Sequence, residues 1–132
     1  MIKRFKKKFG PPKDTVIAFG DYSPKEHMKG KAPAKGVGFR NLFRRNGYEV
    51  YLVDEFRTSC ICFNCGERLE KFHKRPLQIP KSKSSNNFIH GILRCQNVKR
   101  TIWNRDMNAA LNIWKCARCA FNRNERPSAL QR

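Results

Sequence analysis

The stretch Asp-Glu-Phe-Arg-Thr-Ser-Cys-Ile-Cys-Phe-Asn-Cys-Gly, from Asp54 to Gly66, decides the fold expected for this chain. Two adjacent carboxylates follow an apolar segment, and three cysteines come shortly after them. Cys62 and Cys65 have the spacing of a metal-binding turn, because a Cys-x-x-Cys turn supplies two of the four ligands of tetrahedral Zn²⁺. The sequence therefore predicts a metal site that begins just after a strand.

A third ligand is expected downstream, where Cys95 stands in Leu-Arg-Cys-Gln-Asn-Val. A second Cys-x-x-Cys turn would place its other ligand at Val98, which has no donor atom. The fourth ligand stays open between Cys60, His73 and His90. A lapsed site with free thiols is the competing interpretation.

Another Cys-x-x-Cys pair, Cys116 and Cys119, falls on a predicted helix. The two residues lie one turn apart on that helix. Because free cysteine is often buried, we expect them to line a core face rather than to hold a metal.

Composition points to a polyanionic partner. The 132 residues suit one domain with a modest core, and 29 Lys and Arg against 10 Asp and Glu give a net charge of +19. So large an imbalance favours nucleic acid as the partner over a merely basic soluble protein. No apolar run reaches the ~18 residues that a membrane span needs. Clustered cysteines predict metal binding in a reducing, intracellular compartment, which is the nucleus if the source is eukaryotic.

Periodicity predicts a short list of elements. Strands are expected at 15–19, 48–53 and 88–95, and helices at 39–46 and from 104 to 119 or 121. The strand at 48–53 is apolar on both sides, which is typical of the middle of a sheet. On the first helix, Arg40 is expected on a basic outer face with Arg44 and Arg45. Residues 22–38 and 67–90 are predicted to be loops, and 122–132 a disordered tail.

Four carboxylates lie where strands end or a helix begins: Asp21, Asp54, Glu55 and Asp106. Hydrolysis of a phosphodiester by two divalent ions needs several carboxylates at such positions. Turn, edge and helix-start roles explain the same residues without catalysis.

Taken as an ordered set, four motifs resemble the C-terminal part of TnpB and Fanzor proteins, which are transposon-encoded RNA-guided DNA endonucleases. The motifs are Val-Asp-Glu-Phe-Arg-Thr-Ser, Cys-x-x-Cys-Gly, Leu-Arg-Cys and Trp-Asn-Arg-Asp-Met-Asn-Ala-Ala-Leu-Asn-Ile. The resemblance covers about residues 16–120 and is closer to the Fanzor branch. It implies an α/β fold, a partial RNase H-like (RuvC) domain with an inserted, incomplete zinc ribbon.

The resemblance also implies a division of the chain and its site. Residues 1–14 would be a basic lead-in, 15–57 and 101–121 the RuvC-like part, 58–100 the zinc-ribbon-like insertion and 122–132 a basic tail. Glu55 and Asp106 would be catalytic and hold Mg²⁺, with Asp21 near the place where other members keep that glutamate. Structural Zn²⁺ would be held by Cys62, Cys65 and Cys95. DNA and guide RNA would be the partners, and the residues implied to bind them are Arg57, Lys99, Arg100 and Arg105.

The chain departs from the family in ways that affect activity. Nothing before Thr15 resembles the strand that carries the first RuvC aspartate, and Val98 replaces a zinc ligand. We therefore expect a truncated or decayed copy that binds nucleic acid without cleaving efficiently alone. The alternative is a non-catalytic, basic zinc-binding module that stacks bases on Phe63, Phe72 or Trp103. A product that does not fold stably is the third possibility.

Overall fold

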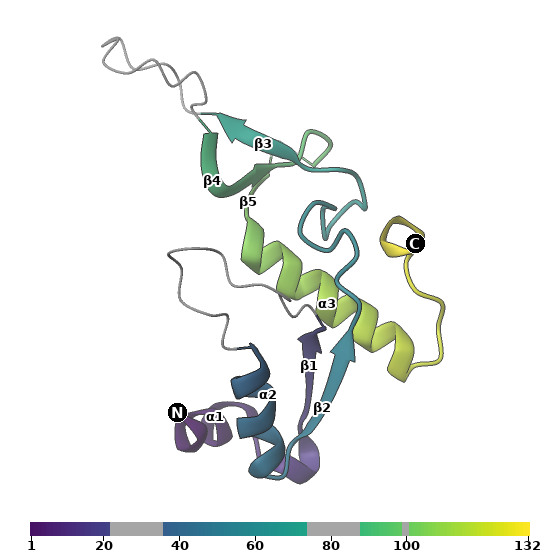
Figure 1. The fold of residues 1–132 in the computed structure, drawn as a ribbon. Helices are drawn as coiled ribbons and strands as arrows, with labels where there is room; N and C mark the ends of the chain where they lie inside the picture. The colour runs from purple at the N-terminus through teal and green to yellow at the C-terminus, as the bar shows by residue number, and fades with distance from the viewer. Residues whose placement is uncertain (22–35, 74–87, 99–100) are drawn as a thin grey trace, which may run out of the picture. The chain divides into compact units, whose positions relative to one another are not determined.

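The computed structural model describes residues 1–21, 36–73, 88–98 and 101–132, which form two compact units (Figure 1). Met1–Glu55 make the first unit and Phe56–Arg132 the second. Both contain short strands and helices, so the mixed α/β class is confirmed, while the RNase H-like assignment stays a prediction. No helix in the described ranges is both long and apolar enough to cross a lipid bilayer.

Two parallel strands form the sheet of the first unit (Figure 1). β1 (Val16–Gly20) pairs with β2 (Glu49–Val53), and the register ends with Gly20 opposite Val53. Both strands were predicted. Because parallel strands end at the same edge of a sheet, the residues that follow them, Asp21 and Asp54, emerge at one edge.

The basic N-terminal segment is helical, which the sequence analysis did not predict. α1 spans Ile2–Phe9, and Gly10 ends it with a φ of 100°. Phe5 packs against Phe43 and Tyr48, with ring centroids 4.7 and 5.4 Å from its own. Three apolar residues of α1 recur at helical spacing, so the signal was present in the sequence. Packing of Phe5 on these rings explains why the segment is a docked helix.

The second helix corrects the prediction for Arg40. α2 spans Gly36–Arg45 and extends the predicted helix by one turn at its start. Arg40 does not lie on an exposed basic face: it is buried, and its guanidinium donates a hydrogen bond to the Gly20 carbonyl at the end of β1. A buried guanidinium requires such acceptors, whereas Arg44 and Arg45 are exposed as predicted.

Within the described residues, β2 does not lie in the interior of a sheet, the position that its apolar pattern predicted. Among the described residues, β1 is the single strand paired with it. Tyr51 and Leu52, on opposite faces of β2, keep 47% and 48% of their surface exposed. The apolar pattern is real, but packing within the described part of the chain does not account for it.

An antiparallel sheet of three strands organises the second unit (Figure 1). Its order is β3 (Glu70–His73), β4 (Phe88–Arg94) and β5 (Ile102–Asn104). β4 was predicted, but β3 lies inside a segment expected to be a loop. Strands as short as β3 and β5 carry too few residues for a clear alternation. Most of the two predicted loops, at 22–35 and 74–87, lies outside the described residues.

α3 (Arg105–Phe121) is the long helix that the sequence predicted. Asn104 caps it, because its side-chain oxygen accepts hydrogen bonds at 3.0 Å from the backbone N–H groups of Asp106 and Met107. Asp106 therefore sits in the exposed first turn of α3.

The C-terminal segment 122–132 is ordered, contrary to the predicted disordered tail. A short 3₁₀ helix spans Ser128–Leu130, and Leu130 keeps only 2% of its surface exposed. The Arg132 guanidinium lies 5.6 Å from the centre of the Phe56 ring. Burial of Leu130 anchors a segment whose polar composition alone suggests disorder.

Candidate metal centre

Cys62 and Cys65 form a tight turn after an irregular segment. The Gly66 N–H donates to the Cys62 carbonyl at 2.9 Å, and the Cys62 N–H donates to the Glu67 carbonyl at 2.8 Å. Gly66 has a φ of 78°, a left-handed conformation that glycine adopts without strain. The glycine after the second cysteine thus lets the chain reverse and bring both thiols to one side.

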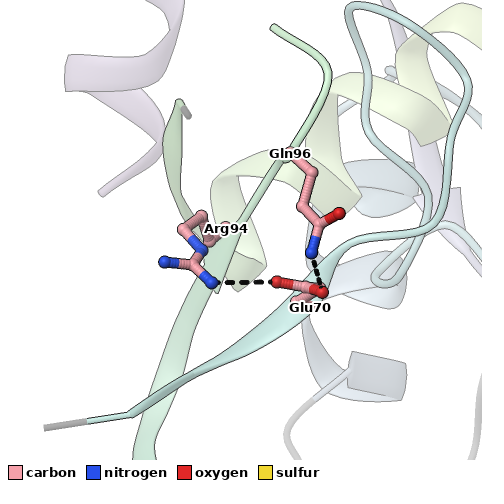
Figure 2. Close-up of polar contacts among 3 residues, drawn as sticks. All are labelled: Glu70, Arg94 and Gln96. Atoms are coloured by element: carbon pink, nitrogen blue, oxygen red, sulfur yellow. Dashed lines mark hydrogen bonds and ion pairs between the residues drawn. The ribbon is translucent and has the colours of Figure 1, made fainter. Parts of the chain in front are cut away.

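Cys95 reaches the same place from the end of β4. Its N–H donates to the Thr101 carbonyl at 2.8 Å, and the Thr101 N–H donates to the Val98 carbonyl at 2.8 Å, which closes a second turn. Glu70 on β3 holds both neighbours of this cysteine (Figure 2). Its carboxylate accepts a hydrogen bond from Arg94 at 3.1 Å and another from Gln96. Cys95 lies between these two residues, so the contacts help to fix its position.

The three thiols are arranged as metal ligands. The sulfur atoms of Cys62, Cys65 and Cys95 all lie within 4.8 Å of one another, and those of Cys65 and Cys95 are 3.5 Å apart. Thiolates at about 2.3 Å from tetrahedral Zn²⁺ lie about 3.8 Å from each other, so the spacing suits zinc. Cys62 and Cys95 are 1% exposed and pack with Leu69 in a small core. This soft, partly desolvated donor set fits a thiophilic metal such as zinc.

The close thiols shift the pKa values of Cys62 and Cys65 in opposite directions. Burial acts to raise the pKa of Cys62, but hydrogen bonds from the backbone N–H groups of Cys65 and Asn64, and from the other two thiols, lower it below its usual value. For Cys65 the Glu67 N–H acts to lower the pKa, but desolvation and the neighbouring Cys95 and Cys62 raise it to about 11. Without a cation, the cluster therefore resists a second negative charge, which a divalent metal would neutralise.

The fourth ligand position is where the site departs from a complete zinc ribbon. Val98 packs against the core around Cys62 and Cys95 instead of supplying a donor. The Cys60 thiol lies 3.5 Å from the Arg57 carbonyl and is not part of the three-thiol cluster. The side chains of His73 and His90 lie outside the described residues. Cys116 is buried, which agrees with the predicted core role.

Two buried asparagines on α3, which the sequence analysis missed, hold the cysteine turn, which comprises residues 57–66. Asn108 and Asn112 are 0% and 1% exposed, and each side-chain NH₂ group donates to the carbonyls of Thr58 and Ile61 at 2.8–3.1 Å. The Asn108 side-chain oxygen also accepts from the Phe63 N–H at 3.0 Å. The helix that begins at Asp106 is thereby bound to the segment that carries Cys62. Three asparagines spaced four residues apart, Asn104, Asn108 and Asn112, were the available signal.

The predicted catalytic carboxylates belong to different units. Glu55 ends the first unit, where its carboxylate lies against Gly20 so closely that a Cβ atom there would overlap it. Asp21 is exposed at the same sheet edge. Asp106 is exposed in the first turn of α3 in the second unit. The juxtaposition of Glu55 with Asp106 stays a prediction.

The predicted nucleic-acid-binding residues are partly described. Arg57 and Arg105 are exposed, while Lys99 and Arg100 lie outside the described residues. Arg57 has a φ of 58°, and its carbonyl accepts hydrogen bonds at 3.1 Å from the N–H groups of Cys60 and Ile61. Its side chain thus leaves the start of the cysteine turn toward solvent.

A three-stranded sheet, a capped helix and a cluster of thiols define a small α/β domain with a candidate metal centre. The chain belongs to the family described as Cas12f1-like, TNB domain, whose model matches residues 40–113, more than half of the chain. This membership confirms the TnpB/Cas12-type relationship and implies nucleic-acid binding. No curated protein matches the sequence.

Proposed function

We propose that this chain is the C-terminal part of a TnpB/Fanzor-type, transposon-encoded, RNA-guided DNA endonuclease. In this proposal, residues 15–57 and 101–121 belong to a RuvC-like domain of RNase H fold, and 58–100 form the zinc-ribbon-like insertion between them. The chain binds nucleic acid and does not cleave DNA efficiently by itself. Family membership and the net charge of +19 support the binding.

The observation that carries the proposal is the connection between the cysteine turn and α3. Asn108 and Asn112 bind the turn to the helix through buried hydrogen bonds. A metal bound by Cys62, Cys65 and Cys95 would therefore stabilise the segment on which the helix with Asp106 rests. Such an arrangement suits a structural metal that supports the helix proposed to carry a catalytic carboxylate.

For the catalytic metal, Glu55 and Asp106 are the proposed ligands in the full-length ancestor. Mg²⁺, when bound, would polarise the scissile phosphate and activate water. In the first unit, Gly20 leaves room for the Glu55 carboxylate, and Arg40 donates to the Gly20 carbonyl beside it. These contacts hold Glu55 at the carboxyl end of the sheet. Asp106 is held by the capped start of α3.

Divalent-ion binding tests this assignment without relying on turnover. Mn²⁺ affinity, measured by electron paramagnetic resonance on zinc-loaded protein, should fall on Glu55→Ala and on Asp106→Ala. The double variant should bind little more weakly than either single variant, because both ligands serve one ion. Asp14→Ala, which removes an exposed carboxylate of the first unit, is the matched control. Unchanged Mn²⁺ binding in either single variant would end the nuclease assignment.

A non-catalytic nucleic-acid-binding module is the second candidate, favoured by a group of rings and cations on the second unit. The Phe63 ring lies 6.5 Å from that of Trp103 and 6.4 Å from that of Trp114, which is 49% exposed. The Lys115 amine lies 5.2 Å from the centre of Phe63, and the Arg118 guanidinium 5.2 Å from that of Trp114. Exposed rings next to cations are typical of single-strand binding surfaces.

Salt dependence and cleavage separate the two candidates. Both predict that affinity for single-stranded DNA falls steeply with salt. For four phosphate contacts, the logarithm of the binding constant should fall against the logarithm of the salt concentration with a slope of about −3. The nuclease candidate alone predicts that any Mg²⁺- or Mn²⁺-dependent cleavage disappears on Asp106→Ala and persists on Asp14→Ala. Binding without any carboxylate-dependent ion site would favour the module.

A further inference from the structure

A recessed pocket lies on the second unit, and none of the three clustered cysteines lines it. Its volume is about 340 Å³, and it is bounded by the turn at Ser59 and Cys60 and by residues of β3 and β4. Such a volume is within the range of small-ligand sites, about 300–1,000 Å³. We propose that this pocket binds one unstacked nucleotide of a single-stranded nucleic acid, an inference that rests on the nucleic-acid binding proposed above.

An irregularity in the sheet creates the pocket. Lys71 pairs with Leu93, whereas His73 pairs with Phe88, so residues 89–92 of β4 lie opposite a single residue of β3. Gly91, within this bulge, has a φ of 86°. A bulge redirects side chains out of the regular alternation. Ile89 and Ile92, which belong to the bulge, accordingly line the pocket.

The floor of the pocket is apolar and rigidly supported. Leu69 lines the pocket and is also a buried member of the core formed with Cys62 and Cys95. Leu93 likewise lines it and packs against that core. The pocket is therefore backed by the candidate metal centre, which holds its shape when metal is bound. An apolar floor of this kind suits the face of a nucleobase.

Charge selects the ligand class. Three cationic residues line the pocket: Arg68, Lys71 and Arg105. All three are exposed, and none of the described residues that line the pocket is acidic. A ligand with an apolar planar part and one or two negative charges matches this combination, and a nucleotide has both. A base within a duplex is stacked and paired, so entry requires an unpaired strand.

Methyl NMR tests the proposal on the intact zinc-loaded chain. With isoleucine methyl groups labelled, an oligothymidylate of about ten residues should shift the signals of Ile89 and Ile92 upfield, because a base that covers them imposes its ring current. Ile17 in β1, which does not line the pocket, is the internal control. An abasic strand of equal length keeps the phosphates and should leave the pocket signals in place. The chain should also bind this abasic strand at least about fivefold more weakly than the oligothymidylate.

Further arms identify the source of the nucleotide and test the charges. If oligouridylate shifts the Ile89 and Ile92 signals at a lower concentration than oligothymidylate does, the nucleotide comes from RNA. The opposite order would assign it to DNA. Lys71→Gln and Arg105→Gln should each weaken binding of the preferred strand severalfold, whereas Arg44→Gln, an exposed charge on α2, should change it less than about twofold.

Each of the following results would overturn the proposal. If the strand binds to saturation while the Ile89 and Ile92 signals stay unmoved, or if the abasic strand shifts them equally, the pocket does not bind a base. The proposed nucleic-acid function would remain intact. Absence of any binding, seen by fluorescence anisotropy, would remove both. An acidic peptide that shifts these signals at lower concentration than either strand would assign the pocket to a protein partner and end the proposal.

Discussion

Substitution of the buried asparagines gives the sharpest test of how the cysteine turn is held. In Asn108→Ala, the Phe63 N–H loses its acceptor, while the carbonyls of Thr58 and Ile61 still accept from Asn112. The Phe63 N–H is partly buried, so loss of its acceptor costs about 1 kcal/mol, and the cavity left at the fully buried Asn108 adds a similar amount, so we expect a loss of about 2 kcal/mol. In Asn112→Ala a similar cavity forms but both carbonyls keep a donor, so the loss should be smaller, about 1 kcal/mol.

The double variant should lose more than the sum of the two, because it leaves Thr58 and Ile61 without either side-chain donor. Urea unfolding followed by tryptophan fluorescence measures these values. Both tryptophans of the chain, Trp103 and Trp114, belong to the second unit, so the signal reports on that unit alone. Asn124→Ala, at an exposed position of the same unit, should have little effect. Equal losses in the two single variants, or strict additivity, would refute the proposed hydrogen-bond roles.

Three further predictions concern the two units and the thiol cluster. Gly20→Ala should be less stable than Gly38→Ala by about 1 kcal/mol in thermal unfolding followed by circular dichroism, because the new Cβ at Gly20 forces the Glu55 carboxylate to rotate away, whereas a Cβ at Gly38 meets no neighbour. A Gly20→Ala variant more stable than Gly38→Ala would contradict the placement of Glu55. Val98→Cys should raise zinc affinity at least about tenfold in a chelator competition, because it would supply a fourth thiolate, and Val50→Cys, in β2, should not. Equal gains in the two variants would show that Val98 does not occupy the position of the fourth zinc ligand. Zinc affinity should increase at least about tenfold per pH unit between pH 6 and 8, because the raised pKa of Cys65, about 11, keeps this thiol protonated until metal displaces its proton; a flat profile would argue against Cys65 as a ligand.

Periodic apolar patterns predicted β1, β2, β4, α2 and α3, and the structure contains all five. The three thiols that could hold a metal were also predictable, because Cys62 and Cys65 lie within one turn and Cys95 follows a strand. The sequence also marks Val98, because a second Cys-x-x-Cys turn would place a ligand there. In the structure Val98 packs against the core that contains Cys62 and Cys95.

Features that depend on tertiary contacts were not predicted. Arg40 reads as a surface residue until the Gly20 carbonyl is placed beside it. Asn108 and Asn112 resemble solvent-facing helix residues, and the hydrogen bonds that they donate to the carbonyls of Thr58 and Ile61 explain their burial. Leu130 in a polar tail gave no periodic signal. In each case a single long-range hydrogen bond or buried side chain decides the structure, and a local pattern does not encode it.

X-ray absorption at the zinc edge tests the central claim most directly. The account predicts that the purified chain binds one zinc ion with three sulfur ligands at about 2.3 Å and one nitrogen or oxygen ligand at about 2.0 Å, because the cluster offers three thiols and Val98 offers none. Loss of one sulfur in Cys95→Ser should follow. A zinc ion with four sulfur ligands, or a folded chain that binds no zinc, would contradict the account.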